Sequence, residues 1–91
     1  MNQELMVVFD AKVERFLEPF AAPSVAFALR EFTRAANGEG QVALYPEDYT
    51  LFHVGTFNAE SGEITAQSPR SIAVAITLVR SEPEGVLNVA S

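Results

Sequence analysis

The spacing of apolar residues predicts one amphipathic helix in the first half of the chain. Pro23 suits its first turn, where a backbone N–H donor is not needed, and Asn37-Gly38 suits its end, because both residues accept left-handed geometry. The face of the helix that is predicted to point away from the core carries Arg30, Glu31 and Arg34. This face is interpreted as solvated or, alternatively, as contacting phosphate. Apolar side chains recur every three or four residues and define the buried face: Val25, Ala28, Leu29, Phe32, Ala35 and Ala36.

Two stretches rich in β-branched and aromatic residues predict strands on either side of this helix. Residues 5–9 form the first strand, which can continue as far as Phe16, and Tyr49–Phe57 forms the strongest one. Residues 58–62 supply turn-forming side chains and a glycine, and strand character resumes over 63–66. This order is typical of a β-hairpin with a loop of about four to six residues.

The apolar stretch over residues 72–79 permits two interpretations. Every second residue from Ile72 to Leu78 is large and apolar, as in a final strand, but Ile72, Ala75 and Val79 also fit helical spacing. We expect the strand. Because both of its faces would be apolar, such a strand also favours pairing with a second copy of the chain.

Turn-forming residues separate the predicted elements. Two prolines should keep residues 17–23 irregular, because each restricts the residue before it.

The segment after Gly38-Glu39-Gly40 resembles a strand, so these glycines are not expected to bind phosphate at the start of a helix. Tyr45-Pro46-Glu47-Asp48 predicts a turn, and residues 81–91 are expected to form a flexible C-terminal tail.

Together these elements predict a single small α+β domain over residues 1–80. One amphipathic helix packs on an antiparallel β-sheet that contains the hairpin. The length of 91 residues, with 48% hydrophobic and 20% charged side chains, fits one small globular unit. A domain of this size has a modest core, so we expect a homo-oligomer. The absence of cysteine excludes disulfides and thiolate chemistry.

The charge distribution limits what the protein can bind. Six basic and twelve acidic residues give a net charge of −6, which disfavours strong binding to a phosphate backbone. Most basic residues precede Gly38, so a weak nucleic-acid interface is predicted there, whereas Arg70 and Arg80 are expected to contribute much less. Its candidate residues are Lys12, Arg15, Arg30 and Arg34.

Patterns for catalysis and metal binding are not found in the sequence. His53 is the single histidine and is interpreted as structural, and neither a metal-binding loop nor a serine nucleophile motif occurs. We therefore predict no enzyme, no cofactor and no metal site. Aromatic residues on a strand can stack bases, but a small chain needs most of them for its core. The acidic start and short apolar runs predict a soluble protein without a signal peptide or membrane span.

A run of residues in the second half of the chain resembles a known phage family. It consists of Pro46-Glu47-Asp48-Tyr49, then Leu51-Phe52-His53-Val54-Gly55-Thr56-Phe57, then Ser61-Gly62-Glu63-Ile64. In this run the chain is similar to the small nonstructural protein of gokushovirus-type microviruses, which are tailless phages with circular single-stranded DNA. The resemblance covers roughly residues 5–72.

The resemblance implies a nonstructural accessory protein in the host cell cytoplasm that acts in genome replication or packaging. The first hypothesis for its activity is weak binding of single-stranded DNA. The alternative is a homodimeric protein-interaction module that recruits phage replication or capsid-assembly proteins without touching DNA. The charge favours the second hypothesis, and the phage context favours the first.

Overall fold

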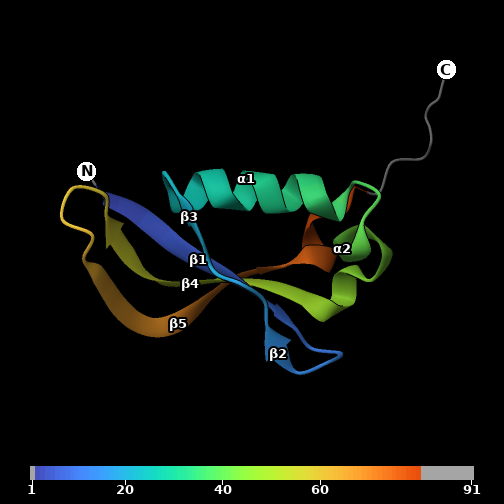
Figure 1. The fold of residues 1–91 in the computed structure, drawn as a ribbon. Helices are drawn as coiled ribbons and strands as arrows, with labels where there is room; N and C mark the ends of the chain where they lie inside the picture. Colours follow the sequence, from blue (N-terminus) through green and yellow to red (C-terminus); the bar gives the residue numbers. More distant parts are fainter. Residues whose placement is uncertain (1, 81–91) are drawn as a thin grey trace, which may run out of the picture.

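One long helix lies across a curved antiparallel sheet in the computed structural model, which describes residues 2–80 (Figure 1). This arrangement confirms the predicted α+β class. The predicted tail over residues 81–91 lies outside the described residues. The elements are β1 (Asn2–Asp10), β2 (Arg15–Phe16), β3 (Phe20–Ala22), α1 (Val25–Ala36), α2 (Gln41–Leu44), β4 (Tyr49–Asn58), β5 (Ile64–Val74) and two 3-10 helices, η1 (Pro46–Asp48) and η2 (Ala75–Leu78).

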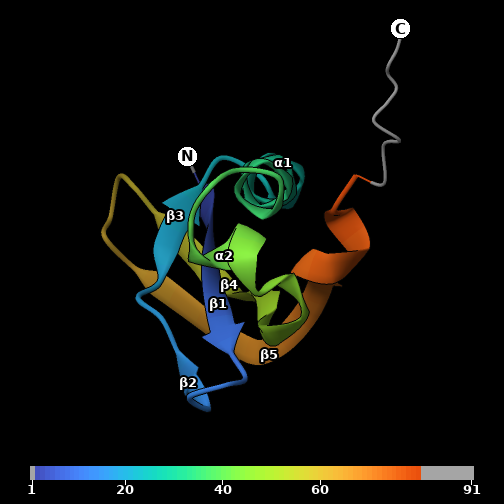
Figure 2. The same ribbon diagram turned by 90° about the vertical axis from the view of Figure 1, so that its right-hand side faces the viewer.

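The five strands form one sheet in the order β2-β1-β4-β5, with β3 also paired to β1. β1 is the central strand, because it pairs with β4 along its whole length and with β2 and β3 on its other edge. The helix α1 covers one face of this sheet, and β5 curves round the far side (Figure 2). The core therefore lies between α1 and the concave face of the sheet.

The predicted N-terminal strand over residues 5–9 is confirmed as part of β1, which runs on only to Asp10. The chain reverses after Asp10, Glu14 adopts a φ of 58°, and β2 returns so that Phe16 pairs with Phe9. An extension of the first strand to Phe16 is therefore wrong. Residues 17–23 are also less irregular than predicted, because β3 lies between Pro19 and Pro23 and pairs with β1. Both prolines flank this strand and do not lie in it, since proline has no N–H group to donate to a neighbouring strand.

The helix α1 confirms the predicted amphipathic helix. Its N-cap is Ser24, whose Oγ accepts the N–H of Phe27 at 3.0 Å, so Pro23 precedes the cap. The helix ends at the predicted position, but Asn37 has a φ of −111° and is not left-handed. The Asn37 amide instead donates to the carbonyl of Thr33 at 2.8 Å and to that of Leu78 at 3.0 Å. This second bond ties the helix end to η2.

The segment between α1 and β4 is helical rather than strand-like. Residues Gln41–Leu44 form α2, which contradicts the predicted strand, and Pro46–Asp48 form η1 at the predicted turn. Four residues make only one helical turn, so α2 has no extended row of aligned peptide dipoles at its start. Gly38 and Gly40 therefore precede a helix and not the predicted strand, but this helix is too short to supply a phosphate-binding N-terminus.

The predicted hairpin is confirmed as β4 and β5, and its second strand is longer than expected. The Asn58 side chain accepts two backbone N–H groups of the loop, and Gly62 takes a φ of 81°. β5 continues past Pro69 to Val74, so residues 72–79 are not a separate strand. They divide between the end of β5 and the 3-10 helix η2.

Buried side chains of α1 and the sheet form a small core. Met6 and Leu51 are the largest fully buried residues, and Ala35, predicted on the buried face of α1, is exposed. The core members are Met6, Ala22, Ala28, Phe32, Ala36, Tyr49, Leu51 and Ala75. Small side chains make up half of this set, which lets α1 approach the sheet closely.

Candidate nucleic-acid interface

The four basic residues predicted to bind nucleic acid occupy two separate places. Lys12 and Arg15 lie at the β1–β2 turn, whereas Arg30 and Arg34 lie on α1. Figures 1 and 2 both draw β2 at the opposite end of the molecule from α1, so the structure does not bring the four together as one strip.

Arg30 and Arg34 are instead joined by Arg80, which was predicted to contribute much less. The three arginines line a groove of about 510 Å³ along the second half of α1, here called the arginine groove. Its other lining residues are Thr33, Asn37 and Gly38. Half of the six basic residues of the chain meet there.

Asn37 positions Arg80 in this groove. The side-chain Oδ1 of Asn37 accepts the backbone N–H of Arg80 at 2.8 Å, while its amide group holds the carbonyl of Leu78. The segment after η2 is thereby fixed to the end of α1. Asn37 and Arg80 are 43 positions apart, and no local pattern in the sequence signals their contact.

The guanidinium groups of the arginine groove are mostly uncompensated. Within residues 2–80, neither Arg30 nor Arg80 forms an ion pair, and Arg34 has only a 3.7 Å contact with Glu31. That pair is well exposed and therefore weak. Arginine stays charged at any ordinary pH, so the groove presents positive charge to an anion. The negative end of the helix dipole opposes an anion at this site, so binding depends on the arginines.

An exposed aromatic ring lies beside the arginine groove. The guanidinium carbon of Arg30 is 5.4 Å from the ring centroid of Phe27, a cation–π arrangement. Phe27 is 39% exposed, and it lines a second hollow of about 380 Å³ with Ser24, Ala26 and Arg30. Arg30 therefore borders both the hollow and the arginine groove.

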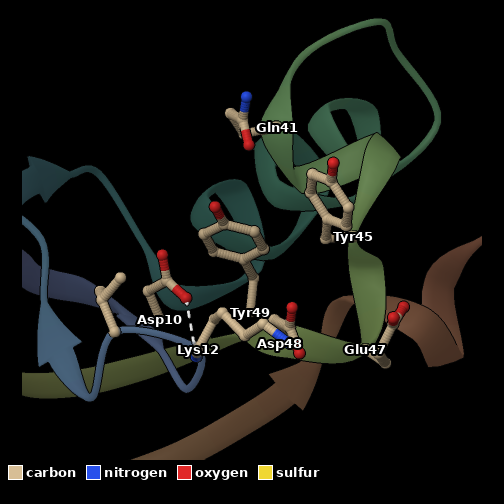
Figure 3. Close-up of a pocket in the computed structure, with 8 residues that line it drawn as sticks. Asp10, Lys12, Gln41, Tyr45, Glu47, Asp48 and Tyr49 are labelled. Carbon is tan, nitrogen blue, oxygen red and sulfur yellow. Dashed lines mark hydrogen bonds between the residues drawn. The ribbon is translucent and has the colours of Figure 1, made fainter.

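Lys12 lies in a pocket that does not suit phosphate. This pocket, of about 530 Å³, also contains the carboxylates of Asp10, Glu47 and Asp48, so negative charge prevails in it (Figure 3). Burial raises the pKa of the Tyr49 hydroxyl above its ordinary value, and the neighbouring Asp10 carboxylate raises it further. Both effects reflect an environment that disfavours added negative charge.

His53 is buried in a polar cluster that links β1, β4 and β5. Its Nε2 lies 2.7 Å from Glu4 Oε1, and its Nδ1 is approached by Gln67 Nε2 at 3.3 Å and Arg70 Nη2 at 3.4 Å. The sequence predicts a structural role for His53 but does not reveal these partners, because strand register and a bulge in β5 bring them together. Arg70 contacts this cluster and is not among the residues that line the arginine groove.

The sequence matches the Phage ORF5 protein family over residues 3–78. The chain belongs to this family. The matched range runs from the second residue of β1 to the end of η2, so it includes Arg30 and Arg34 and stops just before Arg80. Membership of a phage protein family agrees with the phage origin that the resemblance implies. No curated protein and no solved structure matches the chain.

Residues 2–80 contain neither a membrane-spanning helix nor a metal-binding group of side chains. No helix in this part of the chain is long and apolar enough to cross a membrane. No group of three or more histidine, cysteine, aspartate or glutamate side chains in it is placed to hold a metal ion.

Proposed function

We propose that this phage protein is a nonstructural accessory protein that binds single-stranded DNA weakly through the arginine groove. It acts in genome replication or packaging in the host cell cytoplasm. The observation that supports the proposal is the convergence of Arg30 and Arg34 from α1 with Arg80 from the segment after η2 on one groove, where no carboxylate of residues 2–80 pairs with Arg30 or Arg80. Residues 46–64 are similar to the small nonstructural protein of gokushovirus-type microviruses. Because the genome of these phages is single-stranded DNA, this similarity supports single-stranded DNA as the ligand.

The net charge of −6 requires this binding to be weak and strongly dependent on salt. Each phosphate contact to a single strand releases condensed counterions, so log K falls with log salt by about 0.7 per contact. Three arginines then give a slope of about −2. Acidic surfaces elsewhere on the protein would repel the remainder of the strand and keep the footprint short.

The test is fluorescence anisotropy with a labelled oligothymidylate over a series of salt concentrations. The double variant Arg30→Ala/Arg34→Ala should bind more weakly and reduce the slope by about 1.4, because two phosphate contacts are lost. Arg80→Ala should reduce it by about 0.7. A matched control is Lys12→Ala/Arg15→Ala, which removes the same charge at the β1–β2 turn and should change binding little.

Two results would count against the proposal. Equal losses in the two double variants would show that binding is diffuse and does not use the arginine groove. No binding by the unmutated protein at low salt would favour the protein-interaction function instead.

We propose a homodimeric protein-interaction module as the second candidate function, in which phage replication or capsid-assembly proteins are the partners. Its support is a group of large apolar side chains exposed within eight residues: Val13 (59%), Phe16 (46%), Leu17 (45%) and Phe20 (40%). A single 91-residue chain with a small core gains stability by covering such a surface.

Light scattering tests this second function. A dimer mass that falls to the monomer mass in Leu17→Lys supports it, because a buried lysine at an apolar interface is costly. The control Val79→Lys changes a residue of comparable exposure, 38%, outside this segment and should leave the mass unchanged. A monomeric mass of the unmutated protein at high micromolar concentration would contradict it.

A further inference from the structure

We propose that Phe27 stacks an unpaired base of the same strand whose phosphates occupy the arginine groove. This inference rests on the proposed function and assigns its ligand as a single strand with accessible bases. A base in a duplex is stacked between its neighbours and does not offer its face to a side chain.

The geometry of α1 places the ring and the guanidinium groups in line. Phe27, Arg30 and Arg34 are spaced by three and four residues and share the outer face of the helix. With a rise of 1.5 Å per residue, the row is about 10 Å long. Arg80 extends it beyond the helix end, where Asn37 holds its backbone.

The surroundings of Phe27 suit a base. Phe27 is 39% exposed although the Arg30 guanidinium lies over its ring, and the adjoining hollow is lined by the small side chains of Ser24 and Ala26. An aromatic ring paired with arginine is the arrangement by which proteins bind single strands without sequence preference. Because Arg30 borders both the hollow and the arginine groove, one nucleotide can place its base on Phe27 and its phosphate at Arg30.

The other exposed phenylalanines lack this combination. Phe16 is 46% exposed, but its ring packs against Phe9 and Phe52, at centroid distances of 4.8 and 5.5 Å. Phe20 is 40% exposed. Among residues 2–80, Phe27 is the aromatic ring with a guanidinium over it. Phe20 therefore provides a control of equal exposure.

The chain contains no tryptophan, so Phe27→Trp introduces a single fluorescent reporter at the proposed stacking position. On titration with oligothymidylate, we expect its fluorescence to be quenched in parallel with the rise in DNA anisotropy. The control Phe20→Trp should bind the oligonucleotide equally well without quenching.

The variant Phe27→Leu separates stacking from charge. We expect its affinity to fall about tenfold, since loss of one stacked base has roughly this effect. Its salt slope should stay unchanged, because no cation is removed, whereas Arg30→Ala should lower both affinity and slope. Phe27→Tyr keeps an aromatic ring and should restore binding. Circular dichroism should show all of these variants folded, because the ring is partly exposed in the unmutated protein.

The outcomes distinguish failure of this inference from failure of the proposed function. If Phe27→Trp binds DNA by anisotropy without quenching, and Phe27→Leu binds as tightly as the unmutated protein, base stacking at Phe27 is wrong and the arginine groove stands. If the unmutated protein does not bind the oligonucleotide even at low salt, the proposed function and this inference are both wrong.

Discussion

The carboxylate of Glu4 lies 2.7 Å from the imidazole of His53 and joins the start of β1 to the middle of β4. Gln67 and Arg70 both offer N–H donors to the other ring nitrogen, Nδ1. Nδ1 is therefore assigned as the acceptor, and Nε2 donates its hydrogen to Glu4. The Gln67 amide also approaches the His53 carbonyl at 3.3 Å, where β5 bulges away from β4. This cluster supports the sheet at the point where its regular pairing is interrupted.

Removing Glu4 should destabilise the protein through His53. In Glu4→Ala the Nε2–H of a ring that is 8% exposed loses its acceptor, which costs about 1–3 kcal/mol. Urea unfolding followed by circular dichroism measures the loss. Glu39→Ala removes an exposed glutamate from the α1–α2 joint and should change stability by less than about 0.5 kcal/mol. Equal stability of the two variants would show that the Glu4–His53 contact adds nothing.

A methyl group at Gly55 should disrupt the pairing of β4 with β5. A Cβ at this position would lie too close to the backbone oxygen of Thr65 for any side chain, so one strand must move. Gly55→Ala is expected to cost at least about 1–3 kcal/mol, in the range of overpacked cores. Gly40→Ala is the matched control, because no atom of residues 2–80, apart from those of Gly40 itself and its chain neighbours, lies within 4 Å of the position that its new Cβ would take. Similar urea midpoints for the two variants would contradict this account.

Replacement of Asn37 should release Arg80 from the arginine groove. Asn37→Ala loses the bonds to Leu78 and Arg80, and hydrogen exchange of the Arg80 amide should become faster. Asn37→Asp keeps an oxygen acceptor for that amide and should preserve its protection better than alanine does. Unchanged exchange in Asn37→Ala would mean that the observed bond does not hold the segment.

Alkaline pH should weaken folding through Tyr49. Its pKa in the folded protein is raised above the ordinary value of 10.0, first by burial and then by the Asp10 carboxylate, so folding favours the neutral phenol. This contribution is fully present below pH 10 and is lost as the pH rises through the raised folded-state pKa. Tyr49→Phe should flatten the fall in stability above pH 10. Asp10→Asn should shift the Tyr49 absorbance titration towards lower pH, and an unshifted titration would exclude the carboxylate as a cause.

Elements that depend on neighbours within a few residues could be predicted from the order of the amino acids. The stripe of α1 follows from apolar spacing, and the β4–β5 turn follows from Asn58 and from a glycine at the position that needs a positive φ. Both signals act over short distances along the chain. For that reason α1, the hairpin and the α+β class could all be predicted without a structure.

Contacts between residues far apart in the chain became visible only in the folded protein. Residues 72–79 satisfy the spacing of a strand and of a helix, and the pairing of Val74 with Thr50 decides where β5 ends and η2 begins. Arg80 joins Arg30 and Arg34 because Asn37 holds it, and Glu4 reaches His53 because β1 lies beside β4. These contacts depend on strand register and helix placement. Both are set by burial of the whole core, so no local pattern records them.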